Sequence, residues 1–145
     1  MLNVRIRRLA PTVALPEYQS AGAAGFDLAA SEPVTVPPGQ MALVPTGLVI
    51  EVPAGHFLGI FARSSTPLKR GLMVANGVGV VDPDYCGPSD EVKIAVFNVT
   101  ADPVRVAAGD RIAQGLLLPV TRATWQESTG HLRDTSRGGF GATGN

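Results

Sequence analysis

A segment at residues 79–88, GVVDPDYCGP, places two carboxylates and a tyrosine between two apolar runs. The β-branched residues on both sides favour strands, so we expect a hairpin with Asp82 and Tyr85 projecting from its turn. An aspartate in a turn can serve local hydrogen bonding, or it can act as a base toward a bound molecule. The segment alone favours the local role, so its function depends on the residues around it.

Arg63, Ser64 and Ser65 form a second candidate site, directly after the apolar run FLGIF at 57–61. They precede the expected start of a helix, where hydroxyls and free amides bind anions and an arginine adds charge with paired donors. A plain helix cap is the alternative interpretation. Gln114 interrupts an apolar strand pattern, which either a bound ligand or a surface-facing strand position would explain.

The last ten residues, Ser136 to Asn145, are rich in glycine and carry Arg137 and Phe140. A flexible backbone of this kind could close over a ligand, laying the phenyl ring on a planar base and the guanidinium near anionic oxygens. Glycine amides can also approach phosphates closely. The alternative is a disordered terminus with incidental residues.

Short strands must position these groups. Three β-rich runs, at 34–40, 50–56 and 104–110, each end in Pro-Gly or Ala-Gly, which favours a tight reversal. Regular strands of this kind predict an all-β fold, a jelly-roll-like barrel or sandwich, over residues 1–135. Residues 136–145 would form a flexible tail.

One short helix is expected to begin at Ser65 or Thr66, where a hydroxyl cap precedes Pro67 in the first turn. With 17 glycines and 12 prolines in the chain, longer helices have little room.

The composition bounds the function. Among 145 residues, 45% are hydrophobic, which is enough for the core of one domain. Basic and acidic residues number 12 each, so we expect no nucleic acid polymer as partner. Cys86 is the single cysteine, which suits a reducing compartment. No apolar run has the length of a signal peptide or membrane span, so we expect a soluble, cytoplasmic protein without membrane contact.

Five stretches in fixed order resemble the five motifs of the trimeric dUTPases, and the resemblance covers nearly the whole chain. They are AGAAGFDLAA at 21–30, FARSSTPLKRG at 61–71, GVVDPDYCGP at 79–88, GDRIAQGLLLPV at 109–120 and SRGGFGATG at 136–144. The resemblance implies hydrolysis of dUTP to dUMP and pyrophosphate, which limits uracil incorporation into DNA and supplies dUMP for thymidylate synthesis. It also implies a β-clip jelly roll assembled as a homotrimer, with active sites at subunit boundaries and each tail donated by a third chain.

The resemblance further implies a role for each matching residue. Asp82 would orient and deprotonate the attacking water, and the ring of Tyr85 would pack on the deoxyribose and exclude a 2′-hydroxyl. Asn76 and the backbone around Val81 would read uracil.

Other matches concern the phosphates, the tail and the metal. Ser64 would contact phosphate, with Arg63, Ser65 and Gln114 in the same region. Arg137 would hold the terminal phosphate, while Phe140 and Gly141 would cover the base. Asp27 would support a metal-bound water network, and Mg²⁺ would arrive on the nucleotide, since the chain lacks a dense carboxylate cage.

The chain departs from the family pattern in two places. Arg137 and Phe140 are two residues closer together than usual. Either the loop closes with altered geometry, or another arginine, of which Arg133 is the nearest, takes part of the role of Arg137. Pro88, Ser89 and Asp90 form an apparent insertion after Gly87, which we expect to be a bulged or lengthened turn.

Two other functions share these features. A dCTP deaminase has a similar fold but needs a glutamate on the strand after the turn, where this chain has Ala95, and alanine cannot transfer a proton. A catalytically silent trimeric nucleotide-binding protein is the other alternative, against which the intact Asp82, Tyr85, Arg63 and Phe140 argue.

Overall fold

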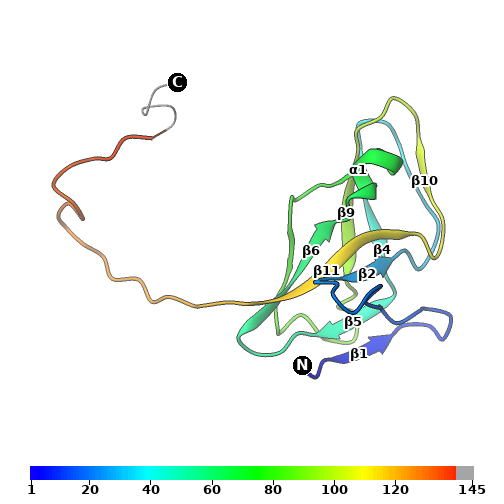
Figure 1. Cartoon of the computed structure of the whole chain (residues 1–145), viewed down its shortest axis with the longest axis horizontal. Helices are drawn as coiled ribbons and strands as arrows, with labels where there is room; N and C mark the ends of the chain where they lie inside the picture. Colours follow the sequence, from blue (N-terminus) through cyan, green and yellow to red (C-terminus); the bar gives the residue numbers. More distant parts are fainter. Residues whose placement is uncertain (140–145) are drawn as a thin grey trace.

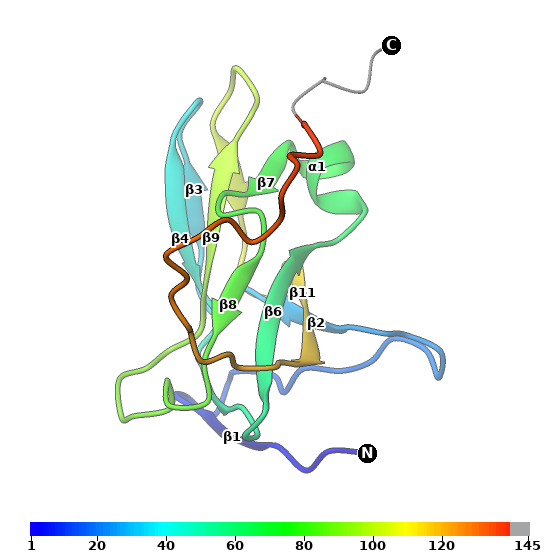
Figure 2. The ribbon, with the colours of Figure 1, turned by 90° about the vertical axis from the view of Figure 1, so that its left-hand side faces the viewer.

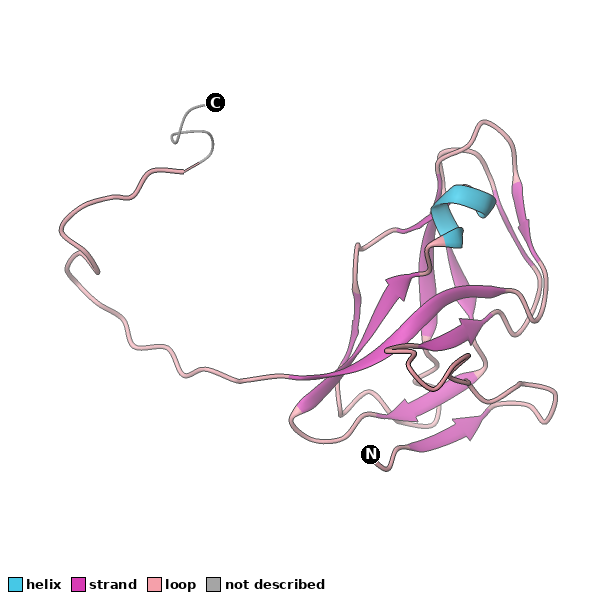
Figure 3. Cartoon of the chain, in the orientation of Figure 1, coloured by secondary structure: helices cyan, strands magenta, loops and turns pink. Residues whose placement is uncertain are grey.

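The computed structural model describes residues 1–139 and shows eleven strands and one helix within them (Figures 1 and 3). The elements are β1 (Arg5–Arg8), β2 (Phe26–Ala29), β3 (Val34–Val36), β4 (Met41–Pro45), β5 (Leu48–Glu51), β6 (His56–Ala62), α1 (Ser65–Arg70), β7 (Leu72–Val74), β8 (Gly79–Val81), β9 (Lys93–Asn98), β10 (Val104–Val106) and β11 (Arg111–Pro119). The predicted all-β fold with one short helix is confirmed.

The strands form two larger antiparallel sheets and two strand pairs. One sheet has the order β2-β11-β6-β8 and the other β4-β9-β7, while β1 pairs with β5 and β3 with β10. In β9, buried residues alternate with more exposed ones, as expected for a strand with one face on the core. The core contains fully buried side chains from both larger sheets, among them Leu28, Leu58, Ile94, Val96 and Ile112.

The three predicted reversals are present as β-turns. A backbone amide donates to the carbonyl three residues earlier from Gln40 to Pro37 (3.2 Å), His56 to Pro53 (3.1 Å) and Asp110 to Ala107 (3.1 Å). The third residue of each turn is a glycine whose φ is positive, between 65° and 85°. A residue with a side chain would be strained in this backbone conformation. Local sequence was therefore sufficient to predict these turns.

Helix α1 begins at Ser65 as expected, but the expected cap by a Ser65 or Thr66 hydroxyl is not formed. Ser64 is the residue before the helix and makes no capping hydrogen bond with its side chain. Instead, the backbone amide of Arg63 donates to Oγ1 of Thr66 (3.2 Å), and the Thr66 hydroxyl donates to the carbonyl of Ile112 (2.8 Å). The buried Thr66 thus joins the helix to β11.

The predicted hairpin around Asp82 is wrong. Both flanks are strands, but β8 pairs with β6, whereas β9 pairs with β4 and β7. Figure 2 shows β8 beside β6, with β9 among the strands of the other sheet. The segment 82–92 is therefore a crossover between two sheets. Strand pairing depends on distant residues, which the local pattern could not reveal.

The last strand ends at Pro119, and residues 120–139 contain neither helix nor strand. Figure 1 shows this segment leaving the end of β11 and extending away from the sheets. Phe140 and Gly141 lie outside the described residues, and the expected boundary at residue 135 stays a prediction. No helix in residues 1–139 is long and apolar enough to cross a membrane.

Candidate active site

Asp82 and Tyr85 lie on a β-turn that begins where β8 ends. Val81 is buried and pairs with Leu58 of β6, so the strand places Asp82 at the edge of the sheet. The amide of Tyr85 donates to the carbonyl of Asp82 (3.2 Å), and the Tyr85 hydroxyl donates to the carbonyl of Glu91 (3.1 Å). Both side chains remain exposed and available to a ligand.

A pocket of about 450 Å³ opens beside this turn. Asn76, which lies on the connection between β7 and β8, lines it together with Val81, Asp82 and Tyr85. Asp82 also borders a second hollow of about 780 Å³. The pocket thus brings together the base, sugar and catalytic candidates named from the sequence.

The apparent insertion after Gly87 is a second β-turn. The amide of Asp90 donates to the carbonyl of Gly87 (3.3 Å), and the Gly87 amide donates to Oδ2 of Asp90 (2.6 Å). This segment was expected to be a bulged or lengthened turn of a hairpin, whereas the structure places it as a separate turn within the crossover. Because two hydrogen bonds close this turn, it reverses the chain between Gly87 and Asp90, just before Glu91.

Asp27 organises a separate polar cluster. Oδ1 accepts from Nε of Arg63 (2.8 Å) and Oδ2 from Nη1 of Arg111 (3.0 Å), while Arg111 also donates to Oε1 of Gln19 (2.8 Å). The Asp27 side chain is 12% exposed, whereas those of Arg63 and Arg111 are 25% and 47% exposed. One carboxylate thus balances two guanidinium groups, which leaves a net positive charge and exposed N–H donors for an anion.

Sequence reasoning missed Arg111 because of a bulge. From Arg111 to Ala113, β11 advances two residues while its partner β2 advances one, from Ala29 to Leu28. Strict alternation would place Arg111 and Gln114 on opposite faces of β11, but an extra residue brings them to the same one. The two buried neighbours Ile112 and Ala113 mark the irregularity, a signal that needs the burial pattern to be recognised.

Ser64, Ser65 and Gln114 are the remaining phosphate-binding candidates, and the fold relates each of them to the Asp27 cluster through the chain or the sheet. The serines follow Arg63 at the start of α1, where Ser64 is exposed and Ser65 is half-buried. Gln114 lies opposite Asp27 in the sheet and donates through Nε2 to the carbonyl of Ala62 (3.0 Å). Its polar side chain therefore has a partner within the fold as well as access to the cluster.

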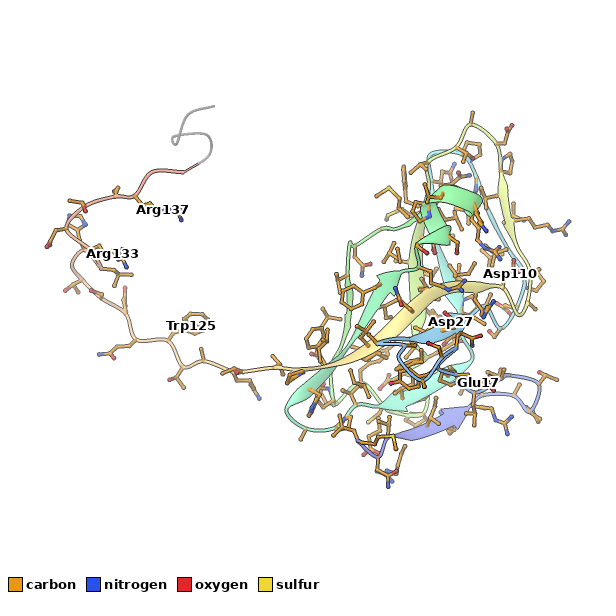
Figure 4. The ribbon with its side chains drawn as sticks, viewed as in Figure 1. Glu17, Asp27, Asp110, Trp125, Arg133 and Arg137 are labelled. Atoms are coloured by element: carbon orange, nitrogen blue, oxygen red, sulfur yellow. The ribbon has the colours of Figure 1, made fainter. Side chains whose placement is uncertain are left out.

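A further ion pair supports this end of the molecule. Nη1 of Arg70, in the last turn of α1, donates to Oδ2 of Asp110 (2.8 Å), and the Ala107 amide donates to the same oxygen (2.9 Å). The hydrogen bond from Arg70, followed by that from Ala107, lowers the pKa of the Asp110 carboxyl. Figure 4 shows Asp110 and Asp27 in the same part of the body.

Within one chain, the two groups of candidates lie apart along β6. Val81 pairs with Leu58 near the start of this strand, so Asp82 lies beside Phe57, whereas Arg63 follows the strand's end. At about 3.3 Å per residue, the stretch from Phe57 to Arg63 is about 20 Å long. The base pocket and the arginine cluster are therefore not one contiguous site in a single subunit.

Arg133 and Arg137 lie on the extended segment far from both groups (Figure 4). Within residues 1–139, no group of three or more His, Cys, Asp or Glu side chains could hold a metal ion. Both oxygens of Asp27 are engaged by arginines. The described residues thus fit a Mg²⁺ ion carried by phosphates better than one bound in a protein cage.

The chain is similar to known proteins over nearly its full length. A family model described as dUTPase matches residues 12–144. The deoxyuridine 5′-triphosphate nucleotidohydrolase of Methylocella silvestris is 45% identical over 151 residues, covering 99% of this chain and 92% of that protein.

Solved structures agree with this likeness. The dUTPase of Streptococcus mutans matches with a TM-score of 0.77 and 32% identity, and the match covers 86% of this chain and 100% of that protein. A mutant dUTPase of the S. aureus phage phi11, whose structure details a structural Mg(II) ion, matches with a TM-score of 0.80 and covers 89% of this chain and 98% of its own. At 19% identity, the latter supports the fold alone.

Proposed function

The chain belongs to the dUTPase family, and on that premise we propose that it hydrolyses dUTP to dUMP and pyrophosphate with Asp82 as the general base. The observation that carries this role is the position of Asp82, exposed on a turn and lining one pocket with Tyr85 and Asn76. A carboxylate beside a bound nucleotide can accept a proton from an attacking water.

The uracil and sugar occupy the pocket beside β8. The backbone around Val81 and the amide of Asn76 supply donors and acceptors for the base. The ring of Tyr85 packs on the deoxyribose and leaves no room for a 2′-hydroxyl. Its hydroxyl, already bonded to the Glu91 carbonyl, keeps the ring in place.

The triphosphate lies against the cluster of Arg63, Ser64, Ser65 and Gln114. Exposed guanidinium donors stabilise the charge that develops on the phosphate oxygens. The water oxygen bonds to the α-phosphorus, its proton passes to Asp82, and pyrophosphate leaves with the electrons of the broken P–O bond.

Mg²⁺ carried on the triphosphate would neutralise charge on its oxygens, as the donor set of the chain allows. Asp27 would act through ordered water, while its direct contacts orient Arg63 and Arg111.

We further propose that the protein is a homotrimer. The outer face of β4-β9-β7 exposes Met41 (68%), Leu43 (61%) and Met73 (51%), and Met41 and Met73 both lie opposite Phe97 of the central strand. Such a contiguous apolar face is typical of a subunit interface. Leu43 and the exposed Val80 also line the nucleotide pocket, so a neighbour packed on this face would complete its wall.

A shared active site also accounts for the separation along β6. In a trimer, the arginine cluster of one subunit can face the base pocket of the next. The extended segment favours donation of the tail, because Trp125 and Leu132 are 94% and 89% exposed on their own chain. Arg137 would then hold the terminal phosphate, and Phe140 and Gly141 would cover the base.

Cys86 is exposed and unbonded to another cysteine, which fits a reducing compartment. We therefore propose that the enzyme works in the cytoplasm.

The experiment that tests the function measures pyrophosphate and ammonia in parallel from dUTP, dCTP, dTTP and UTP. We expect pyrophosphate from dUTP without ammonia, because Ala95, half-buried in β9, cannot transfer the proton that deamination needs. Ammonia from dCTP would establish the deaminase instead, and nucleotide binding without any product would establish a silent binding protein.

A further inference from the structure

The crossover between β8 and β9 is held at several points, although most of it is exposed. Its first half is the Asp82–Tyr85 turn and its second half is the Gly87–Asp90 turn. Pro88 occupies the second position of the latter, where its fixed φ suits a β-turn. A Cβ at Gly87 would lie 2.8 Å from Oδ2 of Asp90, so a side chain there would displace the carboxylate that closes the turn.

The second turn is attached to the N-terminal strand. Arg7 in β1 donates through its guanidinium to the carbonyl of Pro88. Arg7 itself lies opposite Val49 in the β1-β5 pair. A strand with no residue in the proposed catalytic machinery therefore holds the loop that bears Asp82 and Tyr85.

The end of the crossover is fixed to the body of the fold. Three hydrogen bonds join Glu91 and Val92 to the residues around the start of β5. Oε1 of Glu91 accepts from the amide of Gly47 (2.8 Å). The Val92 amide donates to the carbonyl of Leu48 (2.8 Å), and the Thr46 hydroxyl donates to the carbonyl of Val92 (2.6 Å). The Tyr85 hydroxyl donates to the backbone of this same fixed end, at Glu91. The Gly87–Asp90 turn thus lies in the chain between Tyr85 and Glu91, whose carbonyl accepts the hydrogen bond from the Tyr85 hydroxyl.

We propose that Arg7 and Asp90 are positioning residues for Tyr85, and that they make the selection of deoxyribose over ribose depend on the inserted turn and on β1. This inference rests on the proposed function of the Tyr85 pocket. A ring rejects a 2′-hydroxyl by contact only if it cannot move aside when the larger sugar enters. Three inserted residues would add freedom to the loop, and the two contacts remove it.

The test compares the dUTP to UTP ratio of kcat/KM in a set of variants. Arg7→Ala removes the tether and Asp90→Ala removes the acceptor for Gly87, so each should lower the ratio by about fivefold or more. Asp90→Asn keeps a side-chain oxygen and should restore most of the ratio. Arg8→Ala is the matched control, since Arg8 lies on the same strand but donates to Pro11 and Val13 instead of the loop.

Cys86 provides a readout that needs no catalysis. It is exposed and lies between Tyr85 and the inserted turn, and it is the single cysteine of the chain. Its rate of reaction with a disulfide reagent such as DTNB should rise in Arg7→Ala and Asp90→Ala, and should stay near that of the wild type in Asp90→Asn and Arg8→Ala. Thermal unfolding of each variant would confirm that the fold is intact.

The outcomes distinguish a failure of the positioning role of Arg7 and Asp90 from a failure of the proposed function of the Tyr85 pocket. An unchanged dUTP to UTP ratio in folded Arg7→Ala and Asp90→Ala overturns the positioning role, whether or not Cys86 reacts faster. A fall in melting temperature alone would assign these residues to stability. If the wild type does not hydrolyse dUTP, or if Tyr85→Ala leaves the ratio unchanged, the proposed function of the pocket fails, and the Cys86 rates alone then decide whether the tether holds the loop.

Discussion

Asp82 and Asp84 are exposed on the same turn, but their surroundings differ. Asp82 lines the pocket that contains Asn76 and Tyr85, whereas Asp84 borders only the second hollow among the described pockets. Two carboxylates of equal chemistry are therefore distinguished by position. This difference provides an internal control for the proposed general base.

We expect Asp82→Asn to lower kcat by about a hundred- to ten-thousandfold while a non-hydrolysable dUTP analogue still binds. The amide keeps the shape of the side chain but cannot accept the proton of water. Asp84→Asn should retain most of the activity. Steady-state kinetics and calorimetric binding check both variants, and near-normal turnover of Asp82→Asn would exclude it as the base.

How well single residues could be predicted depends on how local their placement is. Asp82 and Tyr85 come together because one turn contains both, so the local sequence was enough to group them. Asn76 lines the same pocket, but only the resemblance to the family pointed to it. Arg111 reaches Asp27 through a bulge in β11, which shifts the face on which it lies. Simple alternation of residues could not predict that contact.

The elements show the same contrast between local and distant determinants. The three Gly-containing turns were predicted because their conformation depends on adjacent residues. The hairpin around Asp82 was predicted wrongly because the partners of β8 and β9 are far away in sequence. The likeness of five motifs to one family supplied the fold type, which the pattern of strands alone left open between barrel and sandwich.

Helix α1 and the turn before β11 are joined by Arg70 and Asp110, and this contact can be tested through pH. Because the pKa of Asp110 is lowered in the folded state, its stabilisation is present above the pKa of an unfolded aspartate and disappears as the pH falls through the lower, folded value. Asp110→Asn should therefore lower the free energy of unfolding by about 0.5–1.5 kcal/mol at pH 7, since the pair is partly exposed.

The measurement is urea unfolding at fixed protein concentration, at pH 7 and at several values below about pH 4. The gap between wild type and Asp110→Asn should narrow at the acidic end. Asp102→Asn, an exposed aspartate in the loop before β10, is the control and should change little. A gap of the same size at every pH would show that the carboxylate charge is not what stabilises this junction.

The whole molecule is proposed to assemble through the exposed apolar face of β4-β9-β7, which includes Met41, Leu43 and Met73. We expect the wild type to have the mass of a trimer by light scattering. Met41→Glu places a charge on this exposed apolar face, so it should dissociate the trimer. Leu68→Glu, on the exposed side of α1, is the control and should leave the mass unchanged. If the Met41→Glu protein is still a trimer, the interface does not include this face of the sheet.

The extended segment links assembly to catalysis. Residues 120–139 run away from their own subunit, and their exposed Trp125 and Leu132 contact little of it. Ordering the tail over a nucleotide costs conformational entropy that contacts from Arg137 and Phe140 must offset. Truncation after Asp134 should therefore leave folding and assembly intact but remove most of the activity.

In the proposed trimer, Asp82 of one subunit works with the tail of another, and mixing two inactive proteins tests this most directly. One is truncated after Asp134 and the other is Asp82→Asn with its tail intact. After subunit exchange at equal amounts, confirmed by mass, about one quarter of the sites would combine a functional Asp82 with a donated tail, because each is present in half of the subunits. We expect dUTP hydrolysis to recover toward that fraction of the wild-type rate. Exchange without any recovered activity would contradict the shared site and would leave a tail that serves its own subunit or none.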